Sequence, residues 1–398
     1  MSVSTPSHDG DGRTVLEIDD LAVRYAVEGG SAVHAVDGAT FSIEAGETYG
    51  LVGESGCGKT TLAKSLIHLL DNNGYIERGE VWYDGTIPRW EGSDGEPTRA
   101  AIEDDDVPVR EDGMTNLAEL SSTQIRDIRW RDIAIIPQSA MNALNPVYKV
   151  GDQIVESIVR HEPETPEAEA YQRARDLLER VGIEPDRADD YAHQFSGGMK
   201  QRAVIAMAMS CNPDVLIADE PTTALDVIIQ DRILEELEQI QEEFGVSIIV
   251  ISHDISVMAE ICDRMAVMYG GKVMESGPKE DIFDATANPY TLGLKNSFPT
   301  ITEAQQDLVS IPGTPPKLQD PDAGCRFRER CPFAVEECHT SHPPMYDAAA
   351  TGTAVLEATD DERAHRTACY RIDEIEQIRA DAAEEHTWTD ETIESQSR

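Results

Sequence analysis

The sequence has 398 residues and carries 76 acidic against 33 basic side chains, a formal net charge of −43. This length allows two or three domains, of which the largest can bury a full hydrophobic core. A surface that binds nucleic acid normally needs a basic face, so the charge argues against that function. The acidic residues are spread along the whole chain, and we interpret them as an adaptation to concentrated salt, which screens their repulsion.

The sequence does not predict a membrane-spanning or secreted chain. No apolar run approaches the roughly 20 residues that span a bilayer. Residues 1–13 are polar and acidic, without the features of a secretory signal, and we expect them to be disordered. Cys57, Cys211 and Cys262 lie far apart, which indicates reduced thiols rather than a disulfide framework. We therefore expect the chain in the cytoplasm.

The first third of the chain predicts strands followed by a glycine-rich loop. Two alternating apolar stretches within residues 15–43 predict antiparallel strands. Residues 47–52 form a compact apolar strand that runs into the loop, and a helix is predicted from residue 60 to about residue 70. Residues 88–116 are rich in Glu, Asp, Gly and Pro with little apolar surface, so we predict a disordered surface insertion there.

The middle of the chain alternates strands with a helical segment. Residues 133–136 predict a strand, and residues 150–181 have helical spacing with polar faces. Residues 215–218 and 247–251 are nearly continuous apolar runs, the pattern of parallel strands covered on both faces. The pair Gly270-Gly271 between two further apolar runs predicts a β-hairpin.

From about residue 288 the chain becomes richer in Pro and Cys, which indicates a second domain. The predicted organisation is a main domain over residues 14–284, with a helical subdomain at about 150–212 and the insertion at about 88–117, then a C-terminal domain over 285–375 and an acidic tail over 376–398.

Residues 53–60 fit the pattern G-x-x-x-x-G-K-[ST] between the predicted strand and helix. The glycines let backbone N–H groups turn inward and bind phosphate oxygens at a helix N-terminus. Lys59 is placed to reach the β- and γ-phosphates, and the Thr60 hydroxyl to ligate Mg²⁺. A glycine-rich turn without a ligand could match by chance, but the strand and helix on either side favour the phosphate loop.

Two carboxylates follow the apolar run at residues 215–218. Asp219 is placed to hold Mg²⁺, often through water, and Glu220 to polarise the attacking water. Paired acids after a strand also occur on ordinary surfaces, so this signal gains its strength from the phosphate loop. A third element begins at Ser196, a good N-cap for a helix predicted over residues 199–211, and its Ser-Gly-Gly start is a second anion site or a plain loop-to-helix joint.

Taken together, residues 15–277 resemble the ATPase of the ABC transporters. The motifs stand in the order of that family: an aromatic that stacks on adenine at Tyr25, the Walker A loop at Gly53–Thr61, the Q-loop glutamine at Gln138, the signature at Ser196–Gln201, Walker B at Asp214–Glu220, the D-loop at residues 224–226 and the switch histidine at His253.

The resemblance implies a fold and a site. The fold is the α/β fold of P-loop NTPases, with a small antiparallel β subdomain, a helical subdomain and a cysteine-containing C-terminal extension. Two ATPase domains close head to tail, and each ATP lies between one phosphate loop and the partner's signature. Catalysis is implied for Glu220, His253 and Gln138, and Mg²⁺ binding for Thr60, Gln138 and Asp219. ATP contacts are implied for Tyr25, Gly53, Glu54, Ser55, Gly56, Cys57, Gly58, Lys59, Thr60, Thr61, Ser196, Gly197, Gly198, Gln201 and Asp226.

Four further segments are similar to the ATPases of oligopeptide and dipeptide importers. These segments are residues 139–146, 222–226, 288–291 and 311–316. That family often has His where Asn288 stands, and the acidic insertion is a second departure. Nickel and oligosaccharide importers share this subunit type, and nothing in an ATPase reads the cargo.

Four cysteines gather after these segments, at Cys325, Cys331, Cys338 and Cys369. Four thiolates suit a 4Fe–4S cluster or a structural Zn²⁺, and reduced thiols are the third alternative. The gaps between them lack the two-residue spacing typical of zinc sites, and three histidines stand nearby, His339, His342 and His365. Some members of the resembled family carry a cluster on such cysteines.

The function implied is an ATP hydrolase on the cytoplasmic face of the membrane, driving uptake of di- or oligopeptides. Its partners are a second ATPase subunit, two permease subunits and an extracellular solute-binding protein. The alternative of another class is an ABC ATPase of DNA repair or iron–sulfur assembly. Those proteins usually have paired ATPase domains or a long coiled coil, whereas this chain has one ATPase domain and a short helical insert.

Overall fold

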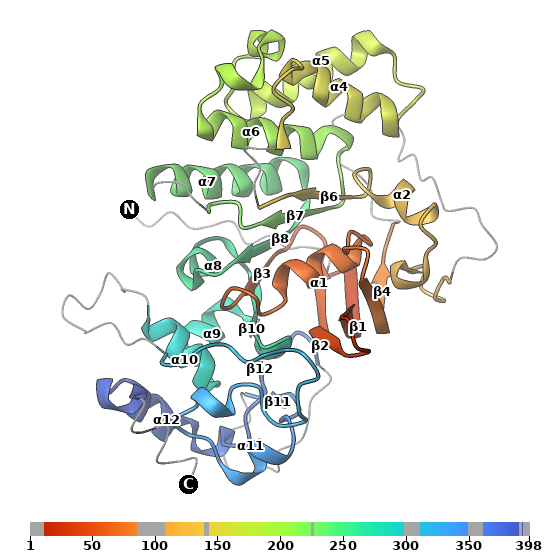
Figure 1. Cartoon of the computed structure of the whole chain (residues 1–398). Coiled ribbons are helices and arrows are strands. Elements are labelled where there is room, and N and C mark those ends of the chain that lie inside the picture. The colour runs from red at the N-terminus through yellow and green to blue at the C-terminus, as the bar shows by residue number, and fades with distance from the viewer. Residues whose placement is uncertain are drawn as a thin grey trace. The chain divides into compact units, whose positions relative to one another are not determined.

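The computed structural model describes residues 12–85, 108–138, 143–223, 227–297, 311–348, 361–389 and 392 (Figure 1). The described residues divide into two compact units. The first unit consists of residues 12–17, 43–48 and 82–251, and the second unit of residues 18–42, 49–81 and those from 252 onward.

The first unit contains a parallel sheet in the order β8-β7-β6. Its strands are β6 (Ile133–Ile136), β7 (Val215–Asp219) and β8 (Ser247–Ser252), and every residue of β7 and β8 is buried. The successive pairs Leu216 opposite Ile248 and Ile217 opposite Ile249 place apolar side chains on the two opposite faces. The prediction of two parallel strands covered on both faces is therefore confirmed.

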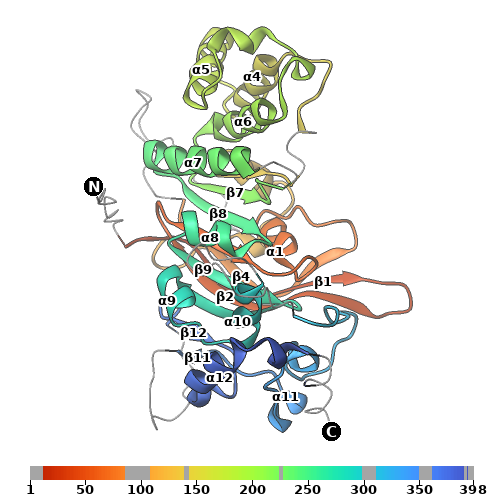
Figure 2. The ribbon, with the colours of Figure 1, turned by 90° about the vertical axis from the view of Figure 1, so that its left-hand side faces the viewer.

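The helices of the first unit follow from apolar spacing. Ile154, Val155 and Ile158 form the buried stripe of α4, and α4 packs on α5 and α6 (Figure 2). The helical spacing predicted over residues 150–181 is thus confirmed. The helices are α2 (Gln124–Ile128), α4 (Val150–His161), α5 (Glu167–Arg180), α6 (Gly197–Ala208) and α7 (Val227–Phe244).

The second unit contains strands in the order β11-β12-β10-β9-β3. Strand β3 (Thr48–Val52) is parallel to β9 (Arg264–Tyr269), which forms the predicted hairpin with β10 (Lys272–Pro278). Gly270 and Gly271 make its turn at φ of +56° and +83°, which glycine adopts without strain. The other elements are β11 (Tyr346–Asp347), β12 (Arg366–Thr367), α1 (Lys59–Leu66), α8 (Ile255–Ile261), α9 (Lys279–Asp284), α10 (Pro289–Asn296), α11 (Glu336–Thr340) and α12 (Ile375–Ala382).

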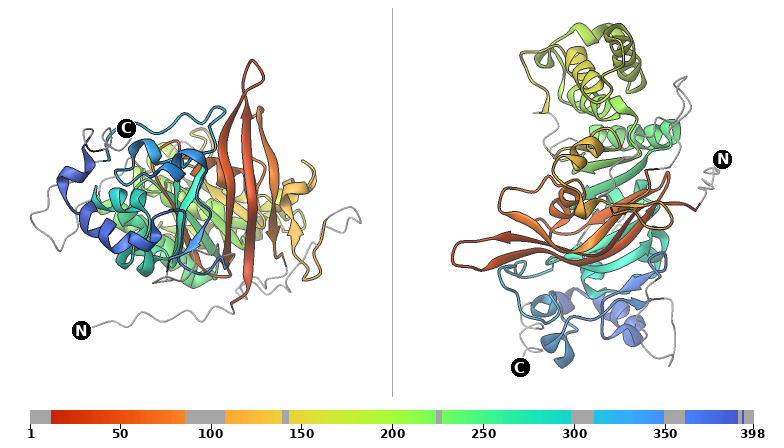
Figure 3. Two further views of the ribbon diagram at one scale, coloured as in Figure 1. Left: turned by 90° about the horizontal axis from the view of Figure 1, so that it is seen from below. Right: turned by 90° about the vertical axis from the view of Figure 1, so that its right-hand side faces the viewer.

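A separate four-stranded sheet has the order β2-β1-β4-β5, and its long strands lie side by side in Figure 3. These strands are β1 (Thr14–Ala26), β2 (Ala32–Glu44), β4 (Gly74–Tyr83) and β5 (Thr115–Asn116). The two strands predicted within residues 15–43 are β1 and β2.

Two local predictions need correction. Helix α1 ends at Leu66, before the predicted residue 70, and His68 follows with φ of +51°. The end of the predicted insertion is ordered, because Thr115 and Asn116 pair with β4 and Arg110 forms an ion pair with Glu17. Residues 86–107 of that insertion lie outside the described residues, as does the N-terminus over residues 1–11.

In the part of the chain that the structure describes, no helix combines the length and apolar character needed to cross a membrane. The described residues after Glu374 form α12 and a 3₁₀ turn over Glu385–Trp388.

Candidate functional site

The phosphate loop leaves β3 through a turn that only glycine can make. Gly53 has φ of +151°, and a Cβ there would lie 2.1 Å from the carbonyl oxygen of Met268. Gly58 has φ of +109°, and a Cβ there would lie 2.1 Å from the carbonyl oxygen of Ala35. The backbone of the loop is therefore set by close packing as well as by its own conformational freedom.

Lys59 opens helix α1 and points back into the loop. Its Nζ donates to the carbonyl oxygens of Gly53 at 2.6 Å and Glu54 at 3.1 Å, and the residue is only 4% exposed. Burial raises the pKa of the Cys57 thiol within the loop, so this side chain stays neutral. Ser55 and Gly56 are exposed at the tip of the loop, and Thr60 and Thr61 are half-buried in the first turn of α1.

Tyr25 and His253 belong to the same unit as this loop. Tyr25 lies in β1 and packs against Gly74, where a Cβ would come within 2.7 Å of its ring. His253 is exposed directly after β8, and the Asp254 side chain caps α8 by accepting a hydrogen bond from the Ser256 N–H at 2.9 Å. The roles predicted for both side chains stay predictions.

The first unit holds the predicted catalytic carboxylate in a small polar cluster. The Gln138 amide donates to Glu220 Oε2 at 2.7 Å, and the Thr223 hydroxyl donates to the same oxygen at 2.8 Å. Glu220 has φ of +48°, an uncommon conformation for a residue with a side chain. Asp219 precedes it and is 2% exposed at the carboxyl end of β7.

Thr223 is a member of this cluster that the sequence reasoning did not assign to the site. The available signal was its spacing: a hydroxyl three residues after a carboxylate in a turn is well placed to reach it. The Thr223 N–H also donates to the Glu220 carbonyl oxygen at 3.2 Å, which closes that turn.

The signature segment also lies in the first unit. The Ser196 hydroxyl accepts a hydrogen bond from the Met199 N–H at 3.3 Å, so Ser196 is the N-cap of α6, as predicted. Ser196 and Gly197 are exposed. Gln201 is buried, and its amide donates to the Pro221 carbonyl oxygen at 3.0 Å, which ties α6 to the turn after Glu220.

The structure therefore brings Gln138 to Glu220 within the first unit. It also places Lys59 inside the phosphate loop of the second unit. Gly198 lies in the first turn of α6, where a Cβ would touch only Ile229. Asp226 and the rest of the predicted D-loop lie outside the described residues, as do residues 139–142 of the segment after Gln138.

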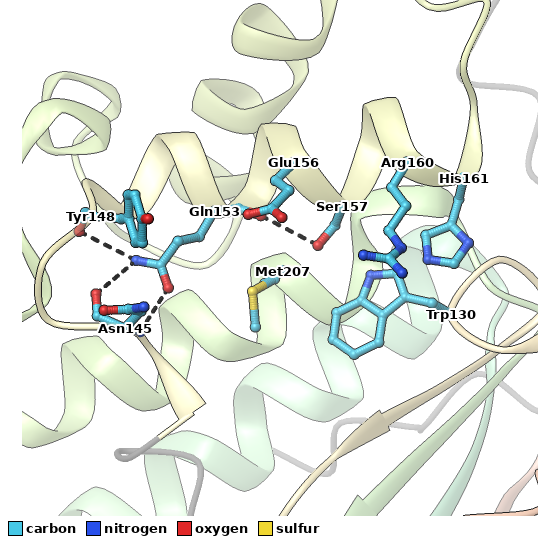
Figure 4. Close-up of a pocket in the computed structure, with 9 residues that line it drawn as sticks. All are labelled: Trp130, Asn145, Tyr148, Gln153, Glu156, Ser157, Arg160, His161 and Met207. Carbon is cyan, nitrogen blue, oxygen red and sulfur yellow. Dashed lines mark hydrogen bonds between the residues drawn. The ribbon is translucent and has the colours of Figure 1, made fainter.

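The first unit also contains a cavity of about 490 Å³ beside α4 (Figure 4). Gln153 crosses one end of it and donates to the carbonyl oxygens of Asn145 at 3.2 Å and Tyr148 at 3.3 Å. Its lining mixes aromatic, charged and amide side chains: Trp130, Asn145, Tyr148, Gln153, Glu156, Ser157, Arg160, His161 and Met207. Burial lowers the pKa of His161, with the Arg160 charge adding to the effect.

The four C-terminal cysteines line one small cavity in the second unit. All four are free thiols, and burial raises their thiol pKa values, to about 11 for Cys325 and about 12 for Cys369. Metal binding requires the thiolate, which this environment disfavours in the absence of a cation.

The described arrangement of these cysteines does not form a ready-made set of metal ligands. Among the described residues, which include these four cysteines, no three His, Cys, Asp or Glu side chains are arranged to hold one metal ion. The nearby histidines have other surroundings: His365 is hydrogen-bonded to Glu275 at 2.8 Å, and burial lowers the pKa of His342 to about 3.

Comparison with known proteins agrees with this geometry. The family model of the ABC transporters matches residues 36–223, and the model of the oligopeptide/dipeptide transporter C-terminal region matches residues 274–338. The oligopeptide transport ATP-binding protein OppD of Bacillus subtilis is 40% identical over 341 residues, which cover 85% of this chain and 87% of that protein. The dipeptide transport ATP-binding protein DppD of the same organism is 42% identical over 332 residues, covering 83% and 90%.

Solved structures agree on the fold. The cassette cbiO1 of Clostridium perfringens has a TM-score of 0.53 at 27% identity, covering 68% of this chain and 91% of that one. A post-hydrolysis dimer of the ATP-binding cassette MJ0796 has a TM-score of 0.53 at 23% identity, covering 66% and 98%. The expected α/β P-loop NTPase fold is thereby confirmed. The chain belongs to the ATP-hydrolysing subunits of the ABC transporters, in the family that carries the oligopeptide/dipeptide C-terminal region.

Proposed function

We propose that this chain hydrolyses ATP to drive the import of di- and oligopeptides. The observation that carries the proposal is the C-terminal region over residues 274–338, because its model describes oligopeptide and dipeptide transporters. The names of the relatives from Bacillus subtilis point to the same cargo. ATP-dependent uptake of a labelled dipeptide into vesicles that hold the assembled transporter tests it. Uptake of nickel or an oligosaccharide in place of peptide would contradict the cargo.

We infer the following roles for the site residues. Backbone N–H groups of the loop Gly53–Thr61 bind phosphate oxygens at the start of α1, and Lys59 neutralises the β- and γ-phosphates. Tyr25 stacks on adenine, and Gln201 fixes the turn beside Glu220, which supports the signature. In the dimer proposed here, the starts of α6 at Ser196–Gly198 and the D-loop residue Asp226 serve the nucleotide of the partner subunit.

The donor set fits Mg²⁺. Thr60, Gln138 and Asp219 offer hydroxyl, amide and carboxylate oxygens, the hard ligands that Mg²⁺ prefers together with phosphates and water. Mg²⁺ is usually held by one or two carboxylates, and Asp219 supplies one. Bound Mg²⁺ supplies charge neutralisation at the phosphates.

The chemistry that this chain supplies centres on Glu220. Its carboxylate orients a water molecule and accepts a proton as the water oxygen bonds to the γ-phosphorus and the bond to the β–γ bridging oxygen breaks. The hydrogen bonds from Gln138 and Thr223 fix the direction of that carboxylate. His253 then helps to align the water and to hold the γ-phosphate.

We propose that the cavity beside α4 receives a cytoplasmic segment of a permease subunit. Tyr148, which lines the cavity, is 56% exposed, and Val147 before it in the sequence is 71% exposed. Exposed apolar side chains gathered together are typical of docking sites. Arg160 in its wall favours a segment that carries an acidic side chain. The paired change Tyr148→Asp and Arg160→Glu should lower recovery of permease subunits from detergent-solubilised membranes and leave ATP binding intact. Undiminished recovery would contradict this docking site.

The partners proposed are a second ATPase subunit, two permease subunits and a solute-binding protein, which places the chain at the cytoplasmic face of the membrane. A pull-down of the tagged chain in high-salt buffer, read by mass spectrometry, tests this assembly. Recovery of only soluble partners would favour the class that serves DNA repair or iron–sulfur assembly.

A 4Fe–4S cluster on the four cysteines is a further proposal. Its support is that Cys325, Cys331, Cys338 and Cys369 line a single cavity, and against it stands the lack of a preformed ligand set. A cluster would have to draw the thiolates closer together as it binds. Iron and sulfide assays of anaerobically purified protein decide the matter, and protein without iron would rule the cluster out.

We also propose that the net charge of −43 reflects adaptation to salt. At low ionic strength the carboxylates repel one another over about 10 Å or more, and concentrated salt shortens that range to about 3 Å. The melting temperature should therefore rise by about 10 °C between about 0.2 M and about 2 M KCl. A melting temperature that stays the same or falls would contradict the proposal.

A further inference from the structure

A buried arginine of the C-terminal region contacts the phosphate loop. Arg330 lies in the 3₁₀ turn Arg328–Arg330, and its side chain is 8% exposed. The guanidinium donates from NH1 to Glu54 Oε2 at 2.8 Å and to the Tyr269 hydroxyl at 3.1 Å. It also donates to the carbonyl oxygens of Pro312 at 2.7 Å and Ile311 at 3.2 Å. A single side chain thus joins the C-terminal region to the second residue of the loop.

Glu54 is held at each of its polar groups. Its N–H donates to the Tyr290 hydroxyl at 3.0 Å, and its carboxylate accepts from Arg330. Its carbonyl oxygen accepts from Lys59 Nζ at 3.1 Å and from the Cys57 N–H at 3.2 Å. The residue therefore connects the phosphate-binding lysine on one side with the C-terminal region on the other.

The groups that hold Glu54 are themselves rigidly packed. The rings of Tyr269, Tyr290 and Phe327 form a buried cluster with centroids 4.6 to 5.2 Å apart. Asn288 fixes the start of α10 by accepting a hydrogen bond from the Tyr290 N–H at 3.0 Å. Burial raises the pKa of the Tyr290 hydroxyl well above its usual value, so this hydroxyl stays protonated.

We propose that Arg330 is a positioning residue for the phosphate loop, and that the C-terminal region thereby sets the nucleotide affinity of its own chain. A glycine-rich loop loses conformational freedom when it binds phosphate, and a loop already fixed at Glu54 loses less. The several N–H donors of a guanidinium suit this task, because one group holds the carboxylate and the supporting backbone at the same time.

A purely electrostatic role would give different results, which makes the proposal testable. If Arg330 acted only as a positive charge near the phosphates, Glu54→Gln would leave that charge uncompensated and tighten ATP binding. The double variant, with both side chains changed to Gln, would restore the charge balance and the original affinity. Arg330→Lys would keep the charge and the affinity.

A positioning role of Arg330 predicts a different ATP affinity for each of these three variants. We expect Arg330→Gln, Arg330→Lys and Glu54→Gln each to raise the dissociation constant for ATP by about tenfold. The double variant should bind ATP as weakly as the weaker single variant, with no recovery of affinity. The increase should persist in concentrated salt, because it does not depend on an unscreened field. At saturating ATP, turnover should fall less than KM rises, since the loop is repositioned by the bound phosphates.

The measurement is equilibrium binding of a fluorescent ATP analogue to the full chain, together with the melting temperature. Arg328→Gln is the matched control: it removes the same charge from the same turn, and its ion pairs go to Asp322 and Glu329. That variant should bind the analogue like the parent. If Arg330→Gln does not fold, Glu54→Gln tests the same contact, because the Glu54 side chain is the more exposed of the two at 23%. Tighter binding by Glu54→Gln, restored affinity in the double variant or unchanged affinity in Arg330→Lys would each overturn the proposal.

Discussion

Two glycine-rich helix starts in this chain, the phosphate loop before α1 and the signature before α6, have similar sequences and contrasting surroundings. The start of α1 has Gly58 as its N-cap and no side-chain cap, and it is enclosed by Ala35, Met268, Tyr290 and Arg330. The start of α6 is capped by its own Ser196 hydroxyl, and Ser196 and Gly197 are exposed.

The difference shows how one local motif can serve two purposes. An enclosed helix start is shaped by its own chain and can bind an anion with little further ordering. An exposed start with a local cap keeps its shape without tertiary support, and its N–H groups remain accessible to a ligand carried by another molecule. This contrast supports the proposal that the start of α1 binds the nucleotide of its own chain and the start of α6 binds the nucleotide of the partner subunit.

The largest expected effect concerns Glu220, the proposed catalytic carboxylate, which belongs to neither helix start. Glu220→Gln should lower ATP turnover of the assembled transporter by about 10³-fold while ATP binding is retained, because the amide cannot accept the proton from water. Single-turnover hydrolysis and equilibrium binding of ATP measure the two quantities. Thr223→Val, which removes only one of the hydrogen bonds to Glu220, should cost about tenfold. Unchanged turnover in Glu220→Gln would remove Glu220 from its proposed role.

The enclosed helix start should be intolerant of substitution. Gly58→Ala would place a Cβ 2.1 Å from the Ala35 carbonyl oxygen at φ of +109°, so we expect about a 100-fold loss of ATP affinity and a free energy of unfolding lower by more than ~2 kcal/mol. Gly56→Ala is the control for stability, because a Cβ there has no atom within 4 Å and meets only the strain of φ at +80°. Equal melting temperatures for the two variants would show that enclosure does not matter.

Helix α7, which packs against α6, carries a carboxyl group whose contact with α6 depends on pH. Glu236 on α7 lies 3.5 Å from Arg202 of α6, and burial raises the pKa of its carboxyl from 4.5 to about 7 despite that neighbour. Because the folded pKa is above the unfolded one, the stabilisation from the protonated group is present below about pH 4.5 and is lost as the pH rises to about 7.

Replacing this carboxyl by an amide, which does not titrate, removes the loss of stability at high pH. Glu236→Gln should raise the free energy of unfolding by about 2 kcal/mol more at pH 8 than at pH 5. Denaturant unfolding at the two pH values measures the difference, and Glu235→Gln at the neighbouring exposed position is the control. The same increment at both pH values would contradict the titration of Glu236.

The smallest expected effect tests the local cap of the open start. Ser196→Ala should destabilise the chain by only ~1 kcal/mol, the usual cost of a lost N-cap. Nucleotide affinity of the isolated chain should stay unchanged, whereas turnover of the assembled transporter should fall by about tenfold. Ser196→Thr keeps the hydroxyl and should retain both properties. A loss of nucleotide affinity in the isolated chain would contradict the proposal that Ser196 contacts the nucleotide of the partner subunit.

Some of these features were predictable because they are local. The N-cap at Ser196 needs only a hydroxyl that accepts a hydrogen bond from an N–H three residues later. The hairpin at Gly270-Gly271 needs only two successive residues with positive φ. The buried strands β7 and β8 follow from unbroken apolar runs. The order of the motifs identified the ATPase fold before any tertiary contact was known.

Other features depended on residues that are distant in the chain. The end of the insertion forms β5 because β4 offers it a partner, which its composition could not reveal. The four cysteines line one cavity, yet their spacing did not show that burial raises the pKa of each thiol.

The sequence by itself thus determined the fold class, the family and the positions of the ATP motifs, because glycine conformation, capping and apolar patterning act within a few residues. Only the tertiary structure decided what surrounds each motif. Glu54 and Arg330 are 276 residues apart in the chain, and their 2.8 Å contact arises because the aromatic cluster of Tyr269, Tyr290 and Phe327 packs the C-terminal region against the phosphate loop. Such a contact is set by the packing of the whole unit, which no short stretch of sequence encodes.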